Sequence, residues 1–253
     1  MDSTLENAAE LQMPARKGGL LESALSVPRG WTQGLSIPFY GCGEPLLQDR
    51  CVTANDTVHR TSVASFYPFG ISQGAACSTL SRLDQKKHAV GRLDATTEWA
   101  VARQLATDSL GLGTPSFEDG TSLGTVADGN FALAGATLEQ AAADAGFGTL
   151  WWLHTSIKGA VLAKANGLFN DDFESPTGAL WVVSPGYPVP GPTTVRMWAT
   201  GPVFAGVEEP FTMNNVDWHV NEDTAFANRQ AIVAFDPCIN LYIDVTIPAS
   251  PTP

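Results

Sequence analysis

Apolar residues recur at helical spacing over one long stretch of the chain, residues 80–106. Leu83, Val90 and Leu105 fall on one face of this stretch, and charged residues occupy the opposite face. A period of three to four residues is typical of an amphipathic helix with one buried side. Gly91 weakens the centre by roughly 1 kcal/mol relative to alanine and allows a bend there. The pattern predicts one long helix early in the chain.

Two shorter helices are predicted in the middle of the chain. The first follows Thr137, which we expect to be its N-cap, with Gln140 at the capping-box position and Gly146 as its stop. The second runs over residues 156–165, with Thr155 or Ser156 as its cap. Between the long helix and these two, the glycine-rich stretch 110–129 is expected to be a loop.

Short apolar runs that end at Gly, Pro or Ser predict strands, and strands dominate the second half of the chain. The order of elements is therefore one long helix, two short helices and a series of strands, which predicts an α+β fold. The predicted strands cover residues 150–153, 178–183, 197–200, 203–206, 217–221, 229–235 and 241–247.

The segment from Leu35 to Cys77 is rich in aromatic residues and poor in charge. A connection this long without helical periodicity is uncommon inside a compact domain. A lone two-stranded hairpin is only marginally stable in water. We therefore expect a hairpin that projects over another copy of the chain, with Phe66 and Phe69 in that contact; for any single aromatic residue, burial in the chain's own core is the alternative.

Both chain ends are expected to be loosely held. A weak helical pattern over residues 5–11 is broken at Pro14 and at Gly18-Gly19, and residues 248–253 are rich in proline, serine and threonine. The first segment is either a free end or an arm that becomes ordered on a neighbouring copy. Removal of residues 1–30 is expected to leave the fold intact and to impair assembly.

Charge is distributed unevenly along the chain, whose formal net charge is −12. Residues 1–107 hold ten basic and ten acidic side chains, whereas residues 108–253 hold four basic and sixteen acidic ones. An acidic surface does not neutralise phosphates and is poorly matched to an anionic membrane. This argues against high-affinity DNA binding and against membrane contact, although the 80–106 helix carries several basic residues.

No targeting or membrane-spanning segment is predicted. The first ten residues carry three acidic residues and lack the basic start of a secretory signal. The longest uncharged stretch, residues 175–195, contains five prolines and cannot form a spanning helix. We expect synthesis in the cytoplasm with reduced thiols.

The cysteines do not form a recognisable chemical motif. Cys42, Cys51, His59 and Cys77 lack the paired spacing of a zinc site, so scattered structural thiols are favoured. A Cys42–Cys51 disulfide across a hairpin is the alternative, although a reducing cytoplasm disfavours it. Cys77 with His154 as nucleophile and base lacks any family signature.

Acidic clusters are interpreted as solvated loops, not as cation sites. The run 170–174 lacks the ligand order and the glycine of an EF-hand, and the pairs at 208–209 and 222–223 are interpreted in the same way. No catalytic residue, cofactor-binding residue or metal ligand is therefore predicted, and the chain is expected not to be an enzyme.

The order of elements resembles the major capsid proteins of tailed bacteriophages with the Hong Kong 97 type fold. Residues 198–203 resemble the exit from the axial domain of these proteins, and 224–237, which contain Asn228, resemble a peripheral strand. The resemblance extends to a closing strand at 238–247, an axial strand and helix from 150, a turn and strand at 178–185, and a spine helix that carries Glu98 and Arg103. It implies an N-terminal arm (1–34), an extended loop (35–78), a spine helix with peripheral domain (79–125), an axial domain (126–204), peripheral return strands (205–233) and a closing strand with tail (234–253).

The resemblance implies a chain that assembles with itself, as hexamers and pentamers, into the icosahedral head shell around phage DNA. It also implies that the long helix lies toward the inside of the shell, where its basic residues would make a weak, salt-sensitive and non-specific contact with the DNA. The shell would be assembled in the host cytoplasm, and scaffolding, portal and decoration proteins are the other implied partners. No lysine lies between Lys17 and Lys86, so covalent crosslinking through a loop lysine is not expected. The alternatives are an encapsulin-like nanocompartment shell, an enzyme with an unrecognised site, and a tail or decoration protein.

Overall fold

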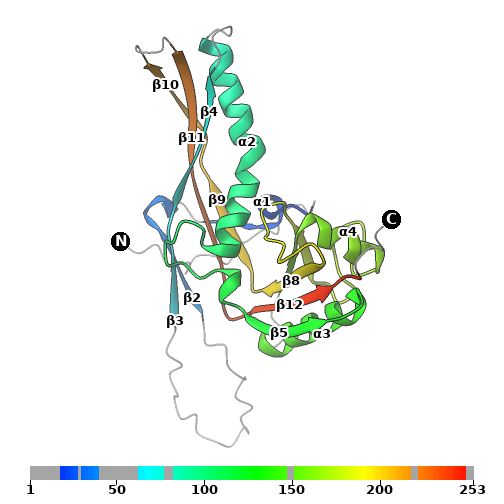
Figure 1. Cartoon of the computed structure of the whole chain (residues 1–253). Coiled ribbons are helices and arrows are strands. Elements are labelled where there is room, and N and C mark those ends of the chain that lie inside the picture. The colour runs from blue at the N-terminus through cyan, green and yellow to red at the C-terminus, as the bar shows by residue number, and fades with distance from the viewer. Residues whose placement is uncertain are drawn as a thin grey trace, which may run out of the picture.

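The structure of the chain is a computed structural model that describes residues 18–27, 30–39, 62–76, 82–146, 151–217 and 222–248. Two sheets, each accompanied by helices, make up most of it, and a separate hairpin extends from one end (Figure 1). Its helices and strands are α1 (Leu20–Ser23), β1 (Leu25–Ser26), η2 (Trp31–Gln33), β2 (Leu35–Phe39), β3 (Ser62–Phe66), β4 (Phe69–Ala76), α2 (Arg82–Thr107), η3 (Phe117–Asp119), β5 (Thr121–Val126), α3 (Phe131–Gly146), β6 (Trp152–Thr155), α4 (Ile157–Ala165), β7 (Leu180–Val183), β8 (Thr194–Thr200), β9 (Val203–Val207), β10 (Phe211–Asp217), β11 (Glu222–Phe235) and β12 (Asn240–Thr246).

The helix α2 and the sheet of β1, β4, β9, β10 and β11 form an elongated part, which we call the long-helix unit (Figure 1). The predicted long helix is confirmed and runs without interruption past Gly91. Leu93, Val101 and Leu105 are buried on its inner face, as the periodicity predicts. Opposite them, β11 presents buried alanines, including Ala225 and Ala227, whose small side chains allow the helix to lie close to the strand.

The second sheet has the strand order β5-β12-β8-β6-β7 and packs against α3 and α4; we call this part the α3–α4 unit. The predicted helix at 156–165 is confirmed as α4, and the Ser156 hydroxyl accepts a hydrogen bond from Gly159 N at 3.3 Å. The buried strand expected at 150–153 is β6, displaced by two residues. The strands expected at 178–183 and 241–247 are β7 and β12.

The prediction of a loop over 110–129 was wrong in part, because residues Thr121–Val126 form β5. This strand lies at the sheet edge, pairs in parallel with β12, and has no buried residue. Strand formation here comes from pairing with a segment more than a hundred residues away, so local alternation of apolar residues did not reveal it.

The helix predicted after Thr137 starts earlier, at Phe131. Asn130 provides the cap, since its Oδ1 accepts a hydrogen bond from Leu133 N at 3.0 Å. Thr137 lies inside the helix, and its hydroxyl donates to Leu133 O at 2.8 Å.

Residues 218–221 of the strand predicted at 217–221 lie outside the described residues, and Asp217 is the last residue of β10. The structure has β10 over Phe211–Asp217, paired antiparallel with a long β11 that begins at Glu222 and includes the predicted strand 229–235. Asp217 lies opposite Glu222 at the end of this pairing. The predicted strands at 197–200 and 203–206 are confirmed within β8 and β9.

Candidate assembly surfaces

The chemical sites weighed from the sequence are not assembled in the described part of the chain. Among the described residues, no group of three or more His, Cys, Asp or Glu side chains could hold a metal ion. In the acidic run 170–174, Asn170 Oδ1 accepts hydrogen bonds from the amides of Asp172 and Glu174, at 2.8 and 3.0 Å. Asp171 pairs with Lys164 at 2.6 Å. These contacts organise a turn.

Three of the four cysteines, Cys42, Cys51 and Cys77, lie outside the described residues, so the interpretations built on them are not tested. Cys238 lies in the turn between β11 and β12 and is disulfide-bonded. The expectation of reduced, scattered thiols was therefore wrong for this residue.

His154 is fully buried and is therefore not placed to act as an accessible base. Its Nδ1 lies 2.9 Å from the Tyr187 hydroxyl, and its Nε2 lies 2.9 Å from Thr200 Oγ1. Thr200 donates its own hydroxyl proton to Gly201 O at 2.8 Å. His154 Nε2–H is therefore the donor to Thr200, and Nδ1 accepts from Tyr187, which defines a neutral tautomer. Burial lowers the pKa of His154 to about 3.

The Phe117 ring connects this polar group to the long-helix unit. It lies 4.7 Å from the His154 ring, 5.9 Å from the Trp198 ring and 5.4 Å from the Phe235 ring, measured between centroids. His154 belongs to β6 of one sheet and Phe235 to β11 of the other. A buried aromatic cluster therefore joins the two units, and its tight packing restricts their relative movement.

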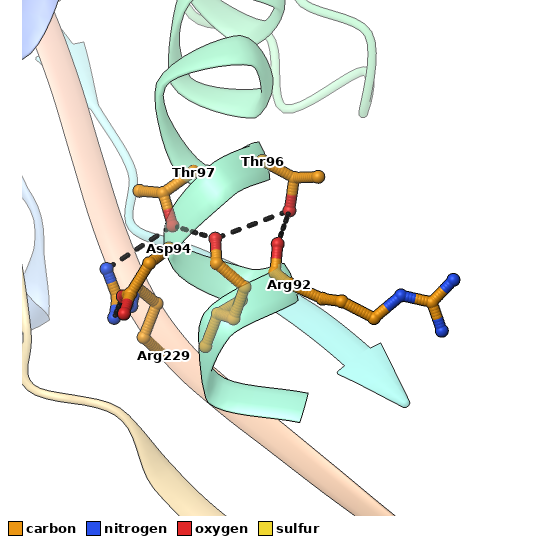
Figure 2. Close-up of polar contacts among 6 residues, drawn as sticks. Arg92, Asp94, Thr96, Thr97 and Arg229 are labelled. Carbon is orange, nitrogen blue, oxygen red and sulfur yellow. Dashed lines mark hydrogen bonds and ion pairs between the residues drawn. The ribbon is translucent and has the colours of Figure 1, made fainter. Parts of the chain in front are cut away.

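A polar clamp holds α2 against its sheet. Figure 2 shows Arg229 of β11 directed at Asp94 and Thr97 of the helix, with an ion pair to Asp94 Oδ1 and a 3.3 Å hydrogen bond to Thr97 Oγ1. From the helix side, Arg92 donates to Gly74 O of β4 at 3.0 Å. The helix is thus fixed to two neighbouring strands by side chains as well as by its apolar face.

The described N-terminal stretch, residues 18–27, packs within its own subunit. Leu20 and Leu25 are buried, and β1 pairs in parallel with β9. Leu20 N donates to Glu98 Oε1 of α2 at 3.2 Å, whereas Val183 N of β7 donates to Gly18 O at 2.7 Å. This stretch therefore bridges both units, and the expectation that removal of residues 1–30 leaves the fold intact was wrong because the deletion removes core residues.

The predicted hairpin is present at the base of the Leu35–Cys77 segment, where β2 pairs antiparallel with β3 and projects away from α2 (Figure 1). Residues 40–61, which would form its outer part, lie outside the described residues. The rest of the segment differs from the expectation. Strand β4 belongs to the long-helix sheet, where it pairs with β11.

Phe66 and Phe69 were expected to contact another copy of the chain, and this was wrong. Both side chains are buried in the core of their own subunit, and the Phe66 ring lies 6.1 Å from that of Phe235. Charge-poor aromatic composition is common to interfaces and cores, so composition alone did not distinguish them.

Exposed apolar side chains gather at two places. On β10, Phe211 and Met213 are 53% and 52% exposed and lie on the sheet face opposite α2, where Met213 is paired with Phe226. On α4, Ile157 and Val161 are 55% and 65% exposed and follow each other by one helical turn. Uncovered apolar groups of this kind mark surfaces for association.

The part of the chain that the structure describes contains no helix long and apolar enough to cross a membrane. No family model and no curated protein matches the chain by sequence.

Solved structures do match it over nearly its whole length. A protein of Mycobacterium phage Che8 is 14% identical with a TM-score of 0.56, over 87% of this chain and 88% of that one. The capsid of an empty GTA particle is 12% identical with a TM-score of 0.56, over 94% and 98%. The chain has a phage capsid fold. The capsid of Myoviridae phage XM1 shares this capsid fold at 11% identity, with a TM-score of 0.50 over 90% and 91% of the two chains.

Proposed function

We propose that this chain is a major capsid protein that assembles with itself into the icosahedral head shell of a tailed phage and encloses its DNA. The observation that carries the proposal is the capsid fold itself, matched over 94% of this chain and 98% of the GTA capsid chain. The role we propose is structural and not enzymatic.

In this proposal, each unit of the structure corresponds to one domain of the Hong Kong 97 type capsid fold. The long-helix unit is the peripheral domain with α2 as spine, the α3–α4 unit is the axial domain, and the hairpin that starts with β2 and β3 is the extended loop. Three strands depart from the linear division expected from the sequence, since β1 and β4 join the sheet that we assign to the peripheral domain and β5 joins the one that we assign to the axial domain. Six copies or five copies would form the two kinds of capsomer.

The uncovered face of β10 is the surface we assign to contact with a neighbouring subunit. Phe211 and Met213 protrude from a face on which Phe226 packs beside Gly74 and Asn228 bonds to Ser72. No described residue covers this end of the sheet face, although Val27 and Trp31 cover it at Gly206. Apolar side chains left exposed in this way are stabilised by burial against a partner. We place the projecting hairpin of the neighbour on this face, and no covalent link through a lysine of the hairpin is involved.

Contact with packaged DNA would be weak in this proposal. Lys87 and Arg92 are exposed on α2, whereas acidic residues dominate the chain after residue 107. Because so few side chains neutralise phosphates, the affinity for DNA would be low and would fall as the salt concentration rises. Scaffolding, portal and decoration proteins are further partners that such a shell requires or accepts.

Sedimentation velocity of the purified chain tests the proposal. A capsid protein is expected to form a fast, homogeneous boundary of closed particles above a threshold concentration. The double variant Phe211→Ser/Met213→Ser is expected to lower the particle yield at least tenfold while its circular dichroism stays unchanged, because both side chains are exposed in the subunit. A chain that remains a monomer or small oligomer at every concentration, with and without DNA and crowding agents, contradicts the proposal.

A further inference from the structure

A pocket of about 350 Å³ lies in the α3–α4 unit, between α3, the turn after α4 and the loop that precedes β7. Apolar residues form most of its wall: Ala132, Ala136, Ala143, Trp151, Leu168 and Pro176. The helix approaches the turn closely, because a Cβ on Gly135 would lie 2.6 Å from Leu168 Cδ2. The volume is near the lower end of the range for small-molecule sites, so the pocket fits a ligand of a few non-hydrogen atoms.

One charged side chain, Glu139 of α3, lines this apolar pocket. It is only 8% exposed, although a glutamate is almost never buried without a partner. Its Oε2 accepts hydrogen bonds from the hydroxyls of Thr177 and of Ser175, the latter at 3.3 Å. Within the described part of the chain, Oε1 has no hydrogen-bond partner, and no lysine or arginine forms an ion pair with the carboxylate. Oε1 is nevertheless reachable from solvent, and in a side chain this buried it is reached through the pocket.

The carboxylate determines which kind of ligand fits the pocket. A buried negative charge is unfavourable unless a positive group compensates it, and the two neutral hydroxyls supply hydrogen bonds but no charge. The rest of the wall offers mainly apolar contact. An ammonium group on an alkyl stem meets both conditions, because it donates hydrogen bonds to Oε1 and its stem is apolar. Trp151 adds to the attraction, since an indole attracts a cation more strongly than other aromatic rings do.

We propose that this pocket binds a small primary alkylamine in its ammonium form. The ammonium donates to Glu139 Oε1, and an alkyl chain of about five carbons lies against the alanines of α3. A free amine fits entirely within the pocket. The backbone attached to a lysine side chain of another protein would instead have to remain outside, beside Gln140 and Thr177, which line the pocket and are exposed. The inference does not rest on the proposed capsid function.

Calorimetric titration of the full-length chain with n-pentylammonium measures the affinity. A dissociation constant on the order of a millimolar is expected for a ligand of this size. Glu139→Gln keeps an oxygen acceptor for Ser175 and Thr177, and it is expected to weaken binding at least about tenfold because the charge is lost. Asp144→Asn is the matched control, since it neutralises an exposed carboxylate of the same helix outside the pocket, and the affinity is expected to stay unchanged. No detectable binding to the unaltered chain, or equal affinity in Glu139→Gln, would overturn the proposal.

Two further ligands test the charge selection and the source of the ammonium group. n-Pentanol has the same length without the charge and is expected to bind the unaltered chain at least about tenfold more weakly than n-pentylammonium. Nα-acetyl-lysine methylamide carries the same ammonium group on a backbone, and it is also expected to bind at least about tenfold more weakly. Equal affinity for n-pentanol would show that the carboxylate does not select the ligand. Equal affinity for the lysine derivative would assign the pocket to a protein side chain, and either result overturns the proposal.

Alanine methyl resonances of the free subunit locate the bound ligand. Addition of n-pentylammonium is expected to shift the methyl signals of Ala132, Ala136 and Ala143, whereas the signal of Ala160, which lines a separate groove beside α4, is expected to stay unchanged. Ala136→Leu fills the pocket from an exposed helix position, and it is expected to weaken binding at least about tenfold while circular dichroism stays unchanged. Shifts at Ala160 alone, or unaltered affinity in Ala136→Leu, would contradict the assignment of the site.

Discussion

Protonation of His154 makes a quantitative prediction about stability in acid. The side chain is buried, both ring nitrogens are hydrogen-bonded in the neutral form, and burial lowers its pKa to about 3. The unfolded chain binds a proton at this residue near pH 6.5, whereas the folded chain does not until about pH 3. Acid therefore favours the unfolded state. The free energy of unfolding is not reduced by this residue above pH 6.5, and it falls as the pH is lowered from 6.5 toward 3.

The magnitude follows from the difference between the two pKa values. Between pH 6.5 and 3 the free energy of unfolding falls by about 1.4 kcal/mol per pH unit on account of this residue alone. At pH 5 the loss is about 2 kcal/mol, and near pH 3 it approaches roughly 5 kcal/mol. A loss of about 2 kcal/mol at pH 5 is a large fraction of the free energy of unfolding of an ordinary domain.

Urea unfolding of the free subunit at pH 7.5 and pH 5 measures this loss. His154→Gln is expected to be less stable at pH 7.5 by about 1–3 kcal/mol, because Tyr187 and Thr200 lose a buried partner. Its further loss on going to pH 5 is expected to be about 2 kcal/mol smaller than that of the unaltered chain. His88→Gln serves as the control, since His88 is exposed on α2. Equal pH dependence in the unaltered chain and His154→Gln would refute the reasoning.

Four further variants test how the units are held, each by urea unfolding with circular dichroism. Arg229→Ala is expected to destabilise the chain more than Asp94→Ala, because the arginine stem is buried whereas the aspartate is largely exposed and worth at most about 1 kcal/mol; equal losses would contradict the proposed clamp. Phe66→Ala is expected to lower the free energy of unfolding by about 3–5 kcal/mol, because the side chain is buried in the core. A loss below about 1 kcal/mol would contradict this burial. Gly186→Ala is expected to be destabilising because its Cβ would lie 2.3 Å from Trp99 O of α2, and unchanged stability would argue against that close contact.

Elements with a strong local pattern were predictable from the sequence. The long helix could be placed because its apolar positions repeat over 26 residues and are buried as expected. The helix after Ser156 could be placed because one side chain caps it. The resemblance to capsid proteins likewise rested on the order of such elements, and the capsid fold agrees with it.

Features that depend on contacts distant in sequence were not predictable in the same way. Strand β5 exists because β12 pairs with it, and β4 leaves the hairpin because β11 provides a longer partner. Phe66 has the composition of an interface residue and lies in the core because Phe235 meets it there. The pocket at Glu139 and the buried His154 group were also missed, since each is assembled from separate segments.

Electron microscopy of the purified, assembled chain tests the central claim most directly. The account predicts closed icosahedral particles in which each subunit has the fold described here, with the β2–β3 hairpin lying on the β10 face of a neighbour. Small oligomers, open fibres, or particles in which the β10 face remains uncovered would contradict it.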